Sequence, residues 1–119
     1  MEYKIEKVIE DIIEKGRKVK DLEDLRRFLQ YATSVLFGKH ECEVYFHGSR
    51  ARGCNRPTSD IDVAIILKSD STDILFATSV IEEALEESRL PYKVDLKILT
   101  KDANDKFIRR VITEGIRWL

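Results

Sequence analysis

CEVYFHGSRARGCNRPTSDIDVAIIL, residues 42–67, decides the fold of this chain. Residues 42–47 are apolar and aromatic, and residues 61–67 are β-branched and nearly all apolar, so both segments predict buried strands. The intervening residues 48–59 are rich in glycine, arginine and Ser/Thr, a composition typical of a loop, with room for one helical turn opening at Ser49. The stretch therefore predicts a strand–loop–strand unit.

Two amphipathic helices are predicted before this unit. Isoleucine and valine recur at helical spacing over roughly residues 3–15, and we expect Gly16 to end that helix. Asp21, with Asp24 three residues later, indicates a weak capping box for a second helix that Gly38 ends. The pattern of both helices fits packing on a sheet and fits a partner interface equally well.

A helix, a strand and a final helix are predicted after the unit. Ser71 or Thr72 is expected to cap the third helix, whose acidic Glu82–Glu87 cluster is expected to face solvent. Residues 92–99 (YKVDLKIL) alternate as a half-buried strand does, and Asp102 is expected to cap a last helix with an apolar face that extends to Ile116.

The predicted order is α-α-β-β-α-β-α, an α+β fold with two layers: a small mixed three-stranded sheet with helices packed against it. We expect one domain over residues 1–119, with an N-terminal helical segment at 1–38 and the core at 43–119.

Composition limits the class of protein. The 119 residues are 43% hydrophobic, as in globular chains, and the formal net charge of −1 argues against a sequence-blind nucleic-acid binder. Cys42 and Cys54 are too few for a disulfide framework and lack zinc-site partners. The first residues do not resemble a signal peptide, and no apolar run is long enough for a bilayer, so we expect a cytoplasmic protein.

Two carboxylates stand at the start of the second strand. Asp60 and Asp62 are two residues apart, so in an extended chain both side chains leave the same face, within about 7 Å of each other. Two adjacent carboxylates repel each other, and a hard divalent cation such as Mg²⁺ relieves that repulsion. The competing interpretation is a pair of solvated residues that cap turns at the start of the strand. We would prefer it if Gly48 and Ser49 did not precede the pair.

Those residues are Gly48 and Ser49. A glycine lets the backbone approach a ligand closely, and the turn after it offers N–H groups and a hydroxyl to a phosphate. Arg50, Arg52 and Arg56 are candidate phosphate contacts, although arginines in a polar loop are as often solvated. His47 is expected to be a packing residue rather than a base.

Asp95 is the third candidate carboxylate, near the middle of the last predicted strand. If the last two strands are neighbours, Asp95 reaches the Asp60/Asp62 pair, and three carboxylates then hold two metal ions. The alternative is an exposed strand position without a function.

Gly48-Ser49, ten intervening residues and Asp60-x-Asp62 make the motif G-S-x10-D-x-D. With FHGSRARG, SDIDVAIIL, the VDL around Asp95 and the closing VITEGIRWL, the chain resembles the DNA polymerase β-like nucleotidyltransferases, and within them the minimal nucleotidyltransferases (MNT). The resemblance covers most of residues 43–119.

The resemblance implies a polymerase β-like palm fold and a transferase that uses two Mg²⁺ ions and ATP. Gly48, Ser49, Arg50 and Arg52 would contact the triphosphate, and Asp60, Asp62 and Asp95 would hold the metals as catalytic residues. Many minimal members accompany a HEPN-domain toxin and, as its antitoxin, adenylylate a tyrosine of it. Two alternatives stay open: an antitoxin that neutralises its partner by binding alone, and a transferase that acts on RNA or a small molecule.

Overall fold

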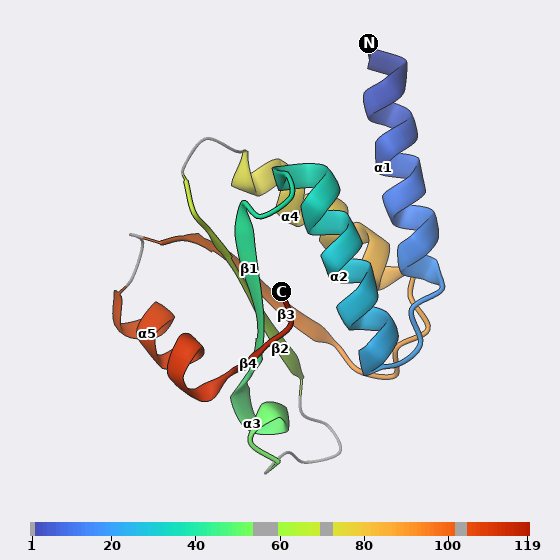
Figure 1. The fold of residues 1–119 in the computed structure, drawn as a ribbon. Coiled ribbons are helices and arrows are strands. Elements are labelled where there is room, and N and C mark those ends of the chain that lie inside the picture. Colours follow the sequence, from blue (N-terminus) through green and yellow to red (C-terminus); the bar gives the residue numbers. More distant parts are fainter. Residues whose placement is uncertain (1, 54–59, 70–72, 102–104) are drawn as a thin grey trace.

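The computed structural model describes residues 2–53, 60–69, 73–101 and 105–119 and shows an α+β chain with helices packed on a sheet, as predicted (Figure 1). The elements follow in the order α1 (Glu2–Arg17), α2 (Leu22–Phe37), β1 (Cys42–His47), α3 (Gly48–Ala51), β2 (Ile61–Leu67), α4 (Ile74–Glu86), β3 (Val94–Thr100), α5 (Asp105–Glu114) and β4 (Ile116–Arg117). The single turn α3 occupies the place where the sequence left room for one.

Over the residues that the structure describes, the sheet has four strands in the order β3-β2-β1-β4, so the prediction of three strands was wrong by one. β2 pairs with β3 in parallel, and β1 pairs with β2 and β4 in antiparallel. The additional strand β4 is two residues long, and the Trp118 N–H donates to the Val44 carbonyl oxygen at 2.7 Å beside it. The last helix consequently ends at Glu114, and Ile116, which we expected on its apolar face, lies in β4 and is exposed.

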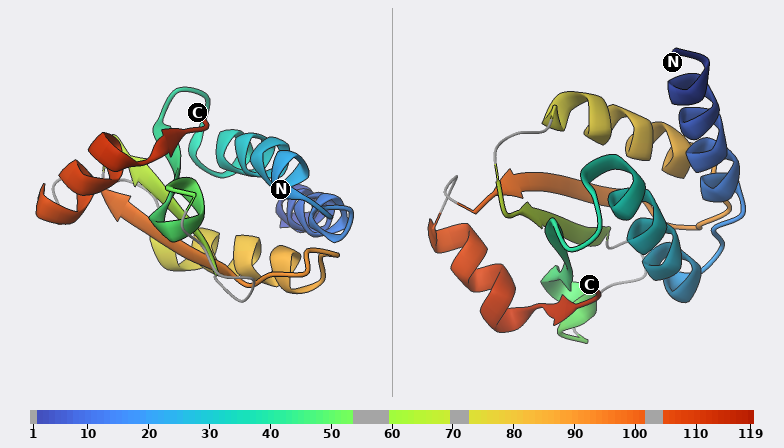
Figure 2. Two further views of the ribbon diagram at one scale, coloured as in Figure 1. Left: turned by 90° about the horizontal axis from the view of Figure 1, so that it is seen from below. Right: turned by 45° about the horizontal axis from the view of Figure 1, so that its top comes forward.

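Helices cover the two faces of the sheet unequally. α1, α2 and α4 lie on one face and α5 lies on the other, as the two views of Figure 2 show. The larger core joins side chains of α1, α2 and α4, such as Ile12, Leu29 and Ile81, to alternate residues of β1 and β2, such as Val44 and Val63. The smaller core lies on the other face of the sheet. It joins Ile108 and Val111 of α5 to Tyr45 of β1 and Ala64 of β2.

Gly16 does not end α1, because the helix continues to Arg17. A Cβ built on Gly16 would lie 2.5 Å from the Ala84 Cβ and 2.9 Å from the Ala84 carbonyl oxygen. The glycine therefore allows α1 to approach α4 closely.

At the other end of α1, Ile5 and Val8 are 57% and 38% exposed, and this end projects beyond the sheet (Figure 1).

The predicted caps of α2 are confirmed. The Asp21 side chain accepts a hydrogen bond from the Asp24 N–H at 2.8 Å, and Gly38 follows the last residue with φ 103°. α4 is capped by Asp73, whose carboxylate accepts from the Phe76 N–H, so the prediction of a cap at Ser71 or Thr72 was wrong. The expected caps Ser71, Thr72 and Asp102 lie outside the described residues.

Trp118, close to the C-terminus, is partly buried and packs against the larger core. Its ring stacks on Phe46 with centroids 5.0 Å apart, and the Gln30 side-chain amide donates to the Trp118 carbonyl oxygen at 2.7 Å. In the part of the chain that the structure describes, no helix is long and apolar enough to cross a membrane.

Candidate active site

The site begins where β1 ends. His47 is the last residue of β1, and the turn α3 opens at Gly48 with a positive φ of 83°. A Cβ at Gly48 would lie 3.0 Å from the Asp62 Cγ and would overlap the Asp62 Oδ2. Only glycine fits both the backbone conformation and the space, so the turn closes directly against the Asp62 carboxylate.

Asp62 and Asp95 are register partners on the neighbouring parallel strands β2 and β3. The prediction that Asp95 reaches the site depended on these two strands being neighbours, and this pairing is confirmed. Burial raises the pKa of Asp62 above its ordinary value, and the Asp95 and Asp60 carboxylates raise that pKa further. The two strands thus bring like charges together at a half-buried position, where a bound cation would be stabilised.

Asp60 is placed less favourably. It precedes β2 by one residue and is exposed, although its charge acts on Asp62. Among the described residues, no group of three His, Cys, Asp or Glu side chains lies close enough together to hold a metal ion. The Lys97 ammonium lies 3.5 Å from the Asp95 carboxylate.

The donor set nevertheless fits Mg²⁺. This cation is usually held by one or two carboxylates together with substrate phosphates rather than by a complete protein cage. Asp62 and Asp95 are two such carboxylates, and the glycine turn beside Asp62 leaves the backbone open to a ligand. Asp60 is near enough to influence the site by charge, so its role as a direct ligand stays a prediction.

His47 faces Asp62 across the β1–β2 ladder. Burial lowers the pKa of His47, and the Asp62 carboxylate opposes that effect only in part. The imidazole ring packs edge-on against Phe107 with centroids 5.7 Å apart. These contacts are those of the packing residue that the sequence predicted.

The predicted phosphate contacts separate into two groups. Ser49 and Arg52 line a hollow of about 290 Å³ beside Asp62. Arg50 instead lies over the Tyr92 ring, with its guanidinium carbon 3.8 Å from the ring centroid. Arg56 and Cys54 lie outside the described residues.

The opposite wall of this hollow comes from α5, which the sequence analysis did not connect with the site. Phe107, Arg110 and Glu114 line it, and Glu114 accepts from the Arg110 Nε at 3.1 Å and lies 3.9 Å from Arg52. The carboxylate of Glu114 therefore holds two guanidinium groups at the rim. The helical spacing of these residues puts them on one face, a signal that was readable once the helix was assigned.

Together these groups suit a substrate with several negative charges. The carboxylates provide cation ligands, the glycine turn provides close backbone approach, and Arg52 and Arg110 provide positive charge on either side of one hollow. Transfer at phosphorus needs mainly such positioning and charge stabilisation.

Comparison with known families agrees with this chemistry. The model of the family described as Polymerase beta, Nucleotidyltransferase matches residues 39–118, which include every candidate residue of the site. No curated protein matches the chain significantly.

Proposed function

Because this chain belongs to the polymerase β nucleotidyltransferase family, we propose that it transfers AMP from ATP to a hydroxyl group of a partner protein. The acceptor we propose is a tyrosine of a HEPN-domain toxin, with this chain as the cytoplasmic antitoxin. The observation that supports the transfer most directly is the placement of Asp62, which lies beside Asp95 in register and against the Gly48 turn.

In the proposed reaction the acceptor oxygen attacks the α-phosphorus of ATP. A new oxygen–phosphorus bond forms, the bond between the α-phosphorus and the bridging oxygen breaks, and pyrophosphate leaves with that electron pair. Asp95 accepts the proton of the acceptor hydroxyl. Asp62 and Asp95 would hold Mg²⁺, which would supply neutralisation of phosphate charge and a lower pKa for that hydroxyl.

The other residues position the triphosphate. The α3 turn begins at Gly48, and its N-cap residue His47 makes no side-chain capping hydrogen bond, so no side chain of that residue competes with a phosphate for the first N–H groups. Arg52 and Arg110 offset the charge that develops on the departing pyrophosphate. Glu114 keeps both guanidinium groups at the rim until an anion binds.

We propose that the partner contacts the N-terminal helical segment, residues 1–38. The family match begins at residue 39, after both helices, so this segment is additional to the matched region. Its outer end exposes Ile5 and Val8 on a helix that projects from the body of the protein. A contiguous exposed apolar patch marks an interaction surface, and Ile5 and Val8 are three residues apart, on the same face of α1.

The test is intact mass spectrometry of the co-purified partner after incubation with this chain, Mg²⁺ and each of the four nucleoside triphosphates. We expect the partner to gain AMP units with ATP, and no gain with the Asp62→Asn variant. Glu83→Gln, on the exposed face of α4, is the matched control and should leave the gain unchanged.

No gain with any nucleotide, despite tight association, would contradict the proposal. If Asp62→Asn still neutralised the partner fully, the antitoxin role would rest on binding alone.

A further inference from the structure

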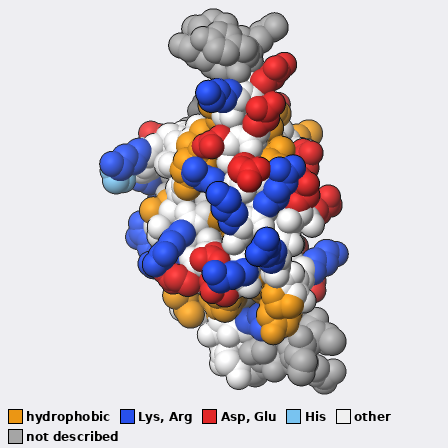
Figure 3. All heavy atoms as spheres, turned by 90° about the vertical axis from the view of Figure 1, so that its right-hand side faces the viewer, with side chains coloured by type: hydrophobic (Ala, Val, Ile, Leu, Met, Phe, Trp, Pro, Cys, Tyr) orange, Lys and Arg blue, Asp and Glu red, His pale blue; other side chains and the backbone are white. Residues whose placement is uncertain are grey.

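Recognition of a triphosphate by this chain depends on where a few side chains are placed. The formal net charge is −1, and on the face drawn in Figure 3 the acidic and basic side chains are intermingled. Long-range attraction of an anion needs an excess of positive charge, which this composition lacks. The position of α3, whose Ser49 lines the candidate active site together with Arg52, therefore matters for affinity.

α3 is too short to hold that position by itself. It has four residues, a single turn, and an isolated turn of helix is not stable in water. A glycine with positive φ stands at each end of the segment, Gly48 at 83° and Gly53 at 76°, and glycine has the greatest backbone freedom of all residues. Contacts with the rest of the chain must therefore fix the turn.

Side chains of the turn and of the residue after it make these contacts. Ala51 packs against the larger core. Arg52, which is exposed, lies 3.9 Å from the Glu114 carboxylate of α5. Arg50 is half-buried, and its guanidinium carbon lies 3.8 Å from the centroid of the Tyr92 ring. That distance is well within the range of about 6 Å over which a cation is attracted to an aromatic face.

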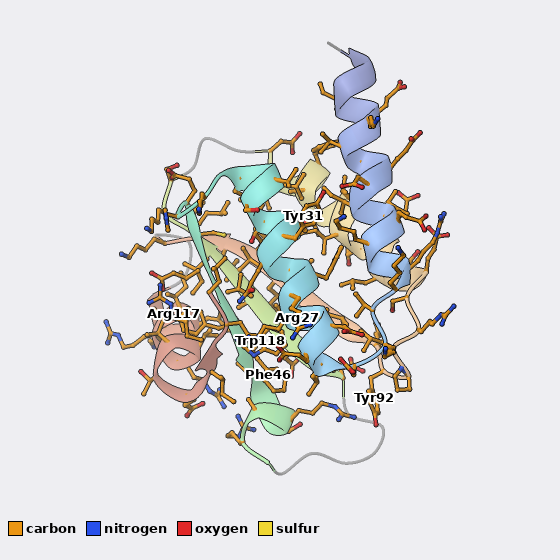
Figure 4. The ribbon with its side chains drawn as sticks, turned by 45° about the vertical axis from the view of Figure 1, so that its right-hand side comes forward. Arg27, Tyr31, Phe46, Tyr92, Arg117 and Trp118 are labelled. Atoms are coloured by element: carbon orange, nitrogen blue, oxygen red, sulfur yellow. The ribbon has the colours of Figure 1, made fainter. Side chains whose placement is uncertain are left out.

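Tyr92 belongs to a segment that is itself fixed. Pro91 precedes it, and the Ile61 N–H donates to the Lys93 carbonyl oxygen at 2.8 Å, directly before β3 enters its register with β2. Figure 4 shows Tyr92 at the end of the sheet where α3 lies. Because α3 follows β1, the contact between Arg50 and Tyr92 joins the end of β1 to the start of β3 across the first residues of β2.

The two arginines differ in what happens to their contacts when an anion binds. In the proposed reaction Arg52 exchanges Glu114 for a phosphate, and an exposed ion pair of this kind is weak in any case. Tyr92 carries no charge, so an anion does not compete with it as Glu114 and a phosphate compete for Arg52. The contact that can hold the turn throughout the reaction is therefore the one between Arg50 and Tyr92.

We propose that Tyr92 is a positioning residue for nucleotidyl transfer. Through Arg50 it holds α3 against the Asp62 carboxylate, at the hollow where the triphosphate is proposed to bind. Arg50 then acts on the triphosphate by fixing the turn, and not by the direct contact that the family resemblance implies. The inference rests on the proposed function and adds to it a residue outside the G-S-x10-D-x-D motif.

Isothermal titration calorimetry of the full chain with MgATP measures the effect. Tyr92→Ala should weaken binding about 3- to 10-fold, and Tyr92→Phe, which keeps the ring, should stay within about twofold of the wild type. Arg50→Ala should lose as much as Tyr92→Ala, and the double variant should lose no more than either, because all three remove the same contact. If urea denaturation shows that Tyr92→Ala is unfolded, Tyr92→Leu takes its place.

Tyr31→Ala is the matched control. It also removes a ring that lies beneath a cation, the Lys15 ammonium at 4.9 Å from the centroid, but Tyr31 is on α2, away from α3 (Figure 4). Its MgATP affinity should equal that of the wild type. The same titrations with inorganic tripolyphosphate and Mg²⁺ separate positioning of the turn from stacking of the base on Tyr92. Positioning predicts the same loss in Tyr92→Ala for both ligands.

The inference alone is overturned if the wild type binds MgATP and Tyr92→Ala binds it equally well. It is also overturned if Tyr92→Phe loses as much as Tyr92→Ala, if the losses of the two single variants add in the double variant, or if the loss is confined to ATP. A wild type that binds neither MgATP nor tripolyphosphate with Mg²⁺ would overturn the proposed function and this inference together.

Discussion

Replacement of Gly48 by alanine would place a methyl group where the structure has the Asp62 carboxylate. The added Cβ would lie 3.0 Å from the Asp62 Cγ and 3.2 Å from its Cβ, and would overlap Oδ2. Normal carbon contacts are about 3.5–4.0 Å, so the carboxylate must move by roughly 1 Å. A group that positions a metal ligand is typically worth about 10- to 100-fold in metal affinity. We therefore expect Gly48→Ala to weaken MgATP binding by at least about tenfold.

Gly53→Ala is the matched control for backbone strain. Gly53 also has a positive φ, 76°, but no atom of the described residues lies within 4 Å of the Cβ that alanine would add. Both variants should lose about 1–2 kcal/mol of unfolding free energy from the left-handed conformation. Only Gly48→Ala should also lose MgATP affinity, measured by isothermal titration calorimetry on protein whose folding is checked by urea denaturation. A folded Gly48→Ala protein that binds MgATP as the wild type does would refute the reasoning.

Three further predictions follow from contacts elsewhere. Gly16→Ala should lower the unfolding free energy by about 1–2 kcal/mol, because overpacking against Ala84 outweighs the gain in helix propensity; urea denaturation should show partial recovery on adding Ala84→Gly. Because burial lowers the pKa of His47, the folded state binds fewer protons than the unfolded state, so stability should fall as pH drops below about 6.5. The urea midpoint of His47→Gln should therefore depend less steeply on pH than that of the wild type. The midpoint of His40→Asn, a substitution at an exposed turn, should depend on pH as the wild type does. Arg110→Ala should weaken MgATP binding about 3- to 10-fold in calorimetry, and Arg110→Lys should retain most of the affinity; equal losses would exclude a charge role.

The features of the fold that were predictable are those that local sequence encodes. Periodicity and caps identified the helices, including the Asp21 cap, because amphipathic spacing and capping are properties of a few adjacent residues. Strand β4 was missed because two residues have no pattern of their own, and the strand exists only by pairing with Tyr45 and Phe46. Gly16 was misread for the same reason, since its role is set by Ala84, distant in the sequence.

In the candidate site too, the residues that are close in sequence were predictable, and those brought together by tertiary packing were not. The closeness of Gly48 and Asp62 was predictable because their spacing in sequence belongs to one strand–loop–strand unit. Asp95 was predicted only on the condition that β2 and β3 pair, which the register now confirms. The wall from α5 was not predicted: helical spacing puts Phe107, Arg110 and Glu114 on one face, but only the tertiary packing brings that face to the hollow that Asp62 lines.

The central claim, nucleotidyl transfer at Asp62, is tested most directly with ATP labelled at either the α- or the γ-phosphate. The chain, its partner and Mg²⁺ are incubated with each label, and the radioactivity retained on protein is measured for the wild type and for Asp62→Asn. The account predicts that the α-label is retained, the γ-label leaves as pyrophosphate, and Asp62→Asn retains neither. Retention of the γ-label, or equal retention by the wild type and Asp62→Asn, would contradict it.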